Sequence, residues 1–69
     1  MTALPTPAEM LARADAELGA AHRALSAAAD WLRSDWPPGH VLTDEQAGQR
    51  AAMRRAISAA QAAIRDGRL

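Results

Sequence analysis

One set of side chains has the residue types that a hydrolase uses. His22, Ser26 and Asp30 are spaced four residues apart, so on a helix they lie in a single row. A base, a nucleophile and an orienting carboxylate are the parts of a catalytic triad. On one straight helix, however, such neighbours stand roughly 6 Å apart at Cβ and all point outward. We expect no second element to form an oxyanion hole, so we interpret the row as a polar flank and the protein as no enzyme.

The other chemically active residues do not group into a metal or cofactor site. His22 and His40 are 18 residues apart, and no pair of His, Asp or Glu at helical spacing has a third ligand nearby. All four glycines are isolated, so the chain lacks a glycine-rich phosphate loop. It also lacks cysteine, which excludes disulfides and thiolate ligands. We therefore expect no metal, no cofactor and no small-molecule substrate.

A row of arginines could contact an anion or an acidic protein surface. Arg50, Arg54, Arg65 and Arg68 fall within roughly 60° of one another at 100° per residue on a helix. Such a row could follow a phosphate backbone, so the alternative function is a small nucleic-acid-associated protein. Eight basic and eight acidic residues give the chain no net charge, which favours the other interpretation, a flank paired with carboxylates. Asp15 is expected near Arg65 or Arg68.

The two tryptophans are candidate anchors of an interface. Trp31 lies about 110° around the helix from the centre of the leucine stripe described below. In a hairpin without a partner, its ring would therefore be exposed to solvent. Trp36 follows five residues later, and tryptophan is among the side chains most enriched at binding hot spots. The alternative is that the loop folds back and covers Trp31 with Pro37 or Val41.

Two start signals and one stop signal predict the helices that position these residues. Thr6–Glu9 and Thr43–Gln46 both have the form of a capping box. The run Trp36–Gly39 reads Trp-Pro-Pro-Gly, which a helix does not continue through. We predict helices over about 7–34 and 44–66, with residues 1–6 as a lead-in and 35–43 as the loop. Gly67 is expected to cap the second helix.

Hydrophobic spacing predicts that the helices pack as an antiparallel hairpin. Leucines recur every seven residues on the first helix, with alanines between them, as in a coiled coil: Leu4, Leu11, Leu18, Leu25 and Leu32, then Ala14, Ala21 and Ala28. The second helix repeats the alternation of large and small residues with Met53, Ile57, Ala60 and Ile64. In this register Arg50 and Arg54 should face Arg33, a repulsion between like charges.

Composition limits how such a hairpin can be stabilised. The 69 residues allow one domain, 1–69, and 19 of the 34 hydrophobic residues are alanine. Strand-forming residues are almost missing, so a sheet is excluded and the fold class is all-α. Alanine buries too little area to offset the conformational entropy of so short a chain. We therefore expect a helical bundle completed by self-association or by docking on a larger protein.

The predicted function is accordingly a non-catalytic protein-interaction module. Its interface should include the two tryptophans and the large seam residues, namely Trp31, Trp36, Leu11, Leu18, Leu25, Leu32, Ile57 and Ile64. No stretch approaches the ~20 apolar residues of a membrane span, so we expect no membrane partner and a cytoplasmic or virion location. The alanine-rich, arginine-only composition suggests an accessory factor of a GC-rich bacterium or its phage, such as an assembly component or an inhibitor of a host protein.

Overall fold

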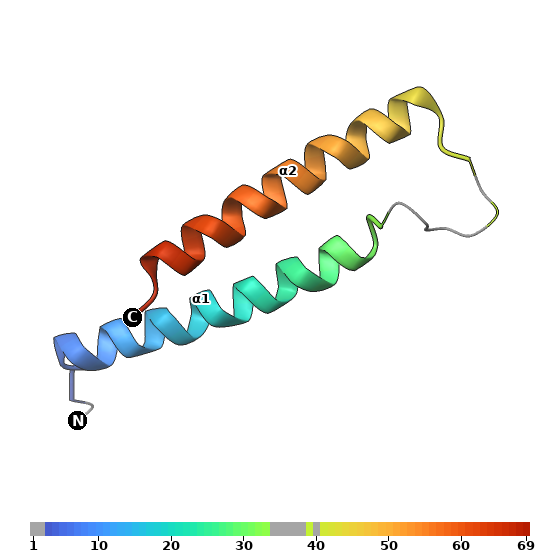
Figure 1. Ribbon diagram of the computed structural model, residues 1–69. Helices are drawn as coiled ribbons and strands as arrows, with labels where there is room; N and C mark the ends of the chain where they lie inside the picture. Colours follow the sequence, from blue (N-terminus) through green and yellow to red (C-terminus); the bar gives the residue numbers. More distant parts are fainter. Residues whose placement is uncertain (1–2, 34–38, 40) are drawn as a thin grey trace.

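The computed structural model describes residues 3–33, 39 and 41–69, and this part of the chain forms two α-helices and no strand. Helix α1 spans Pro7–Asp30 and helix α2 spans Asp44–Gly67, and the two lie side by side (Figure 1). The predicted all-α helical hairpin is confirmed. Trp36 and most of the predicted loop 35–43 lie outside the described residues.

Both helices begin where the capping residues predict. The Thr6 hydroxyl accepts a hydrogen bond from the Glu9 backbone N–H at 3.1 Å. At the start of α2 the capping box is complete, because Thr43 accepts from the Gln46 N–H at 3.1 Å and its own N–H donates to Gln46 Oε1 at 3.0 Å. These bonds satisfy N–H groups that have no partner within the helix, which fixes where each helix starts.

The end of α1 differs from the prediction, because the helix stops at Asp30 and not near residue 34. The Trp31 N–H donates to Ala28 O at 3.2 Å and the Leu32 N–H donates to Ala29 O at 3.0 Å, so the last turn tightens to bonds between residues three apart. The last turn of α1 contains no basic residue to oppose the negative end of the helix dipole. The leucine repeat continues past this point, but the α-helix does not.

Gly67 is not the cap of α2 that the sequence suggested. It is the last helical residue, and Gly39 is the one glycine with a positive φ in the described part of the chain. The capping position falls on Arg68, whose backbone is extended, with φ −83° and ψ 155°. This extended turn carries Arg68 and Leu69 toward α1, where both bind one carboxylate.

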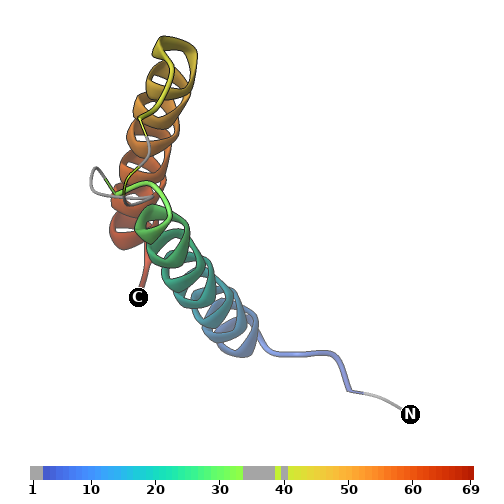
Figure 2. The same ribbon diagram turned by 90° about the vertical axis from the view of Figure 1, so that its right-hand side faces the viewer.

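The helices are offset along their length, so each extends past the other. Near one end Arg68 is hydrogen-bonded to Asp15 of α1, and near the other end Arg54 of α2 is hydrogen-bonded to Leu32. Residues 7–14 of α1 therefore project beyond one end of the contact and residues 44–53 of α2 beyond the other. We call these segments the α1 overhang and the α2 overhang. Figure 2 shows that the helices are also inclined to one another, which shortens the strip along which they meet.

No hydrophobic side chain is fully buried in the described residues. Five large residues of the predicted stripes are half-buried: Leu18, Leu25, Leu32, Ile57 and Ile64. Leu11 continues the same heptad row into the α1 overhang and is 59% exposed, and Met53 in the α2 overhang is 54% exposed. Both side chains are uncovered because the opposite helix does not reach them.

Gly19 is the one fully buried residue of either helix. A Cβ atom at this position would lie 2.9 Å from Nη1 of Arg68, whose guanidinium lies flat against the glycine. A glycine in a helix costs about 1 kcal/mol relative to alanine. Here the absence of a side chain lets Arg68 cross α1 and reach Asp15, one turn away.

The substitution Gly19→Ala should therefore stabilise the native chain less than it stabilises the Arg68→Ala variant. With the guanidinium removed, we expect the full gain in helix propensity of about 1 kcal/mol. With Arg68 present, the new methyl group displaces the guanidinium and the gain is smaller. Urea unfolding of the four variants at one fixed chain concentration measures the difference. An equal gain in both backgrounds would contradict the proposed contact.

Candidate interaction surface

Asp15 joins the two helices at the end where α2 finishes. Arg68 donates to it through two nitrogens, Nε to Oδ1 at 3.0 Å and Nη2 to Oδ2 at 2.9 Å. The Leu69 backbone N–H donates to Oδ1 at 2.9 Å. Two parallel bonds between a guanidinium and a carboxylate fix their relative orientation as well as their separation. We call this group the Asp15 clasp, and it confirms the predicted approach of Asp15 to Arg68.

The clasp changes the acidity of the carboxyl group. The hydrogen bonds from Arg68 and then from Leu69 lower the pKa of Asp15 from its ordinary value of 3.8 to about 2. The same pairing raises the pKa of Arg68. Because the carboxylate is favoured in the folded state, its contribution to stability is complete above about pH 3.8 and is lost as the pH falls through about 2.

Gln61 joins the helices near their middle. Its Nε2 donates to Ser26 Oγ at 2.9 Å and to the His22 backbone oxygen at 3.4 Å. The Ser26 hydroxyl in turn donates to the same His22 oxygen at 3.2 Å. The polar row expected to be a flank thus includes a contact between the helices. Gln61 lies on the same face of α2 as the arginine row. Its position on that face did not indicate that it would bond to Ser26 of α1.

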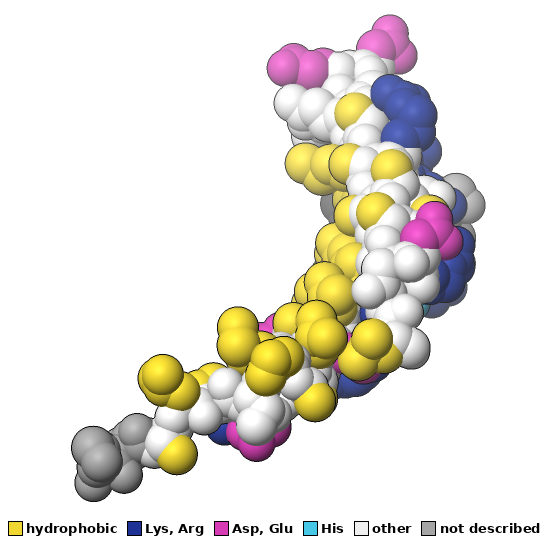
Figure 3. Space-filling model, turned by 90° about the vertical axis from the view of Figure 1, so that its left-hand side faces the viewer, with side chains coloured by type: hydrophobic (Ala, Val, Ile, Leu, Met, Phe, Trp, Pro, Cys, Tyr) yellow, Lys and Arg dark blue, Asp and Glu magenta, His cyan; other side chains and the backbone are white. Residues whose placement is uncertain are grey.

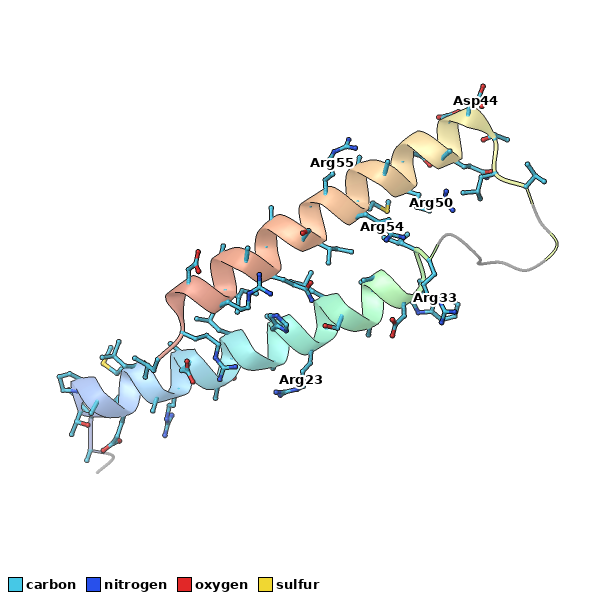
Figure 4. The ribbon with its side chains drawn as sticks, in the orientation of Figure 1. Arg23, Arg33, Asp44, Arg50, Arg54 and Arg55 are labelled. Atoms are coloured by element: carbon cyan, nitrogen blue, oxygen red, sulfur yellow. The ribbon has the colours of Figure 1, made fainter. Side chains whose placement is uncertain are left out.

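Arg54 joins the helices at the end of α1. Its Nη1 donates to the Leu32 backbone oxygen at 2.8 Å. Figure 4 shows Arg50 and Arg54 pointing toward this end of α1, where Arg33 also lies, whereas Arg55 points away. The carbonyl groups at a helix C-terminus attract cations. Arg54 therefore supplies from α2 a positive charge near the end of α1, whose own last turn has none.

The arginine row is consequently divided between two roles. Arg54 and Arg68 hold the hairpin together through the bonds described above. Arg50 is half-buried beside the end of α1, and Arg65 is exposed. Two of the four residues proposed to contact an anion or a partner are thus already used within the chain.

Trp31 lies at the edge of a cleft of about 220 Å³. The cleft is lined by the two residues that follow α1, by one residue before α2 and by residues within α2: Trp31, Leu32, Leu42, Gln46, Gln49, Arg50 and Met53. Trp31 is 71% exposed, and Val41, one of the residues expected to cover it, is itself 96% exposed. Pro37 and Trp36 lie outside the described residues. We call this feature the Trp31 cleft.

Three of the seven large exposed hydrophobic residues in the described part of the chain lie in the overhangs: Met10 and Leu11 in the α1 overhang, and Met53 in the α2 overhang. Leu4 precedes α1 and Trp31 follows it, while Val41 and Leu69 lie in the segments before and after α2. Figure 3 shows hydrophobic side chains along the concave edge of the molecule, from the start of the chain onto α2, with basic side chains on the opposite edge. This apolar edge is the candidate interaction surface.

The candidate catalytic and metal-binding residues form no site in the part of the chain that the structure covers. His22 and Ser26 meet Gln61, while Asp30 is exposed at the end of α1. No group of three or more His, Cys, Asp or Glu side chains within the described ranges could hold a metal ion. Neither α1 nor α2 combines the length and the hydropathy needed to cross a bilayer.

The Asp15 carboxyl should titrate well below its usual range. NMR titration of the side-chain carboxyl should give a pKa of about 2 in the native chain, and Arg68→Gln should return it toward 3.8 because the largest cause of the shift is removed. Arg65→Gln, the matched control, removes a cation from the same turn and should leave the value unchanged. A native value near 3.8 would show that the clasp does not form.

Arg54→Gln should destabilise the hairpin more than Arg55→Gln. Both variants lose one charge from adjacent positions of α2, but only Arg54 donates to Leu32 O. We expect a loss of about 0.5–1.5 kcal/mol for Arg54→Gln and little change for Arg55→Gln. Chemical unfolding followed by circular dichroism measures both. Equal losses would mean that the bond does not support the end of α1.

Within the described residues the geometry offers contacts between the helices and an uncovered apolar edge. A comparison with protein-family models, curated proteins and solved structures found no match to this chain.

Proposed function

We propose that the protein is a non-catalytic interaction module. It is an antiparallel two-helix hairpin with a Leu/Ala heptad seam, and a protein partner completes it as a helical bundle. The partner covers the apolar edge described above, and the conformational entropy of the hairpin is offset only when that edge is buried.

The observation that carries this proposal is the lack of a core. The described residues contain no fully buried hydrophobic side chain, and their only buried residue is Gly19. Burial of apolar area is the dominant favourable term in folding. A hairpin whose largest side chains are half-buried or exposed obtains little of this term by itself.

The dimensions of the chain support the same conclusion. Its Cα radius of gyration is 17.4 Å, whereas a compact domain of this length has a value of about 11 Å. It exposes 5691 Å², whereas a compact protein of this mass exposes about 4,200 Å². The excess of about 1,500 Å² is close to twice what one partner buries in a standard interface.

Mass action links partner binding to folding. A partner that binds the folded hairpin and not the unfolded chain stabilises it by an amount that grows with partner concentration. The Asp15 clasp, Gln61 and Arg54 then set how the helices align, and the partner supplies the missing burial. Folding and binding are a single equilibrium in this proposal.

Nucleic-acid binding is the weaker interpretation of the arginine row. It requires Arg50, Arg54, Arg65 and Arg68 to act together on phosphates. Arg54 and Arg68 instead donate to Leu32 O and Asp15 within the chain. Association that persists at high salt, and no retardation of DNA or RNA at low salt, distinguish the two functions.

The isolated monomer should be only marginally folded. We expect the helical signal in circular dichroism at the lowest usable concentration to melt over a broad range and to start decreasing near room temperature. Adding a partner, or concentrating the chain where it is its own partner, should raise the melting temperature. A cooperative, heat-resistant transition in the dilute monomer would contradict the proposed function.

A further inference from the structure

We propose that the partner is a second copy of this chain, arranged so that the α1 overhang of each copy packs into the Trp31 cleft of the other. This inference rests on the proposed function and specifies its partner. The dimer is symmetric, so the same contact forms twice.

The two complementary features lie at opposite ends of one molecule. The α1 overhang presents Met10 and Leu11, which are 57% and 59% exposed, while Trp31 and Met53 line the cleft at the other end. Leu11 and Trp31 are separated along α1 by about 20 residues, or roughly 30 Å, so an overhang cannot reach the cleft of its own chain. In a pair related by a two-fold axis across the helices, each overhang lies beside the partner's cleft.

The cleft has a size that suits aliphatic side chains. Its volume of about 220 Å³ equals the share of roughly seven water molecules in the liquid. Leu32, Leu42 and Met53 give it apolar walls, and Trp31 adds a large ring at its edge. Exchanging water in such a cleft for Leu11 and Met10 of the second copy buries apolar surface on both partners.

Charge does not oppose the antiparallel pairing of copies. The α1 overhang carries Glu9 and Arg13, a net charge of zero, and the α2 overhang carries Asp44, Glu45 and Arg50, a net −1. Because one of the two segments is neutral, bringing them together causes no net repulsion. The chain as a whole has no net charge, so copies do not repel one another.

The area available fits a dimer. Two separate chains expose about twice 5691 Å², whereas a compact protein of twice the mass exposes about 6,900 Å². Complete packing would therefore bury up to about 4,500 Å² in total, within the range of permanent dimers. A second copy therefore offers enough surface for a permanent dimer.

Sedimentation of the native chain across a dilution series tests the inference. We expect a reversible change from twice the chain mass to the single mass. Leu11→Glu and Met53→Glu should each raise the dissociation constant about tenfold or more, because each removes an apolar contact from both copies of the interface. Leu11 and Met53 are more than half exposed in one copy, so the helices themselves are not disrupted.

Two exposed alanines provide matched controls with the same introduced charge. Ala16 lies about 140° around α1 from Leu11, and Ala51 lies about 160° around α2 from Met53. Ala16→Glu and Ala51→Glu should change the dissociation constant less than about threefold. Equal weakening in control and interface variants would overturn the proposed surface.

Cross-linking tests the orientation, because the chain has no cysteine of its own. A mixture of Leu11→Cys and Met53→Cys chains, oxidised as the dimer, should give mainly the mixed disulfide. If most disulfides instead join two Leu11→Cys chains or two Met53→Cys chains, the antiparallel arrangement is overturned.

The outcomes separate this inference from the proposed function. A chain that stays single and poorly folded at every concentration, or that forms trimers or larger species, overturns the dimer but leaves an interaction module. A single chain that is stable by itself overturns both. A dimer with the expected variant effects supports both.

Discussion

The two helices meet along a strip that is too short and too narrow to enclose a hydrophobic side chain. Alanines at many of its positions provide little area, and the inclination and offset of the helices shorten the contact further (Figures 1 and 2). Hydrophobic burial in one chain is correspondingly small. This shortage explains why the chain is extended and why its surface retains large apolar residues.

Because little apolar surface is buried between the helices, polar contacts determine how α1 and α2 align. Arg68 on Asp15, Gln61 on Ser26 and Arg54 on the Leu32 carbonyl lie at one end, the middle and the other end of the contact. Exposed polar contacts contribute little free energy individually, but their geometry is directional. They fix the offset of the helices, and the offset creates the overhangs. The proposed interface is thus a consequence of where three polar side chains find partners.

The starts of both helices could be predicted from the sequence because capping is local. Thr6 and Thr43 each act on an N–H three residues away. The end of α1 could not, because no local stop signal falls at Asp30 and the first prolines after it are Pro37 and Pro38. The leucine repeat predicted one continuous stripe, but whether Leu11 is covered depends on how far α2 extends. The role of Gly19 could not be predicted either, because it depends on Arg68, which lies far along the chain on the other arm of the hairpin.

The candidate interaction surface could be predicted from the sequence only in part. Exposure of Trp31 follows from its angular distance to the leucine stripe, and the structure shows it exposed beside a cleft. The division of the arginine row was not predictable, because periodicity places Arg50, Arg54 and Arg68 on one face without distinguishing their partners. Spacing along one helix shows which residues share a side, and partners on the other helix depend on the offset.

Amide hydrogen exchange at two chain concentrations tests most directly whether an outside partner completes the hairpin. The account predicts that protection throughout α1 and α2 is strong in the concentrated sample and falls toward the unfolded limit on dilution, with Leu11 and Met53 losing protection first. Strong and equal protection in both samples, with the dilute chain at its single mass, would contradict it.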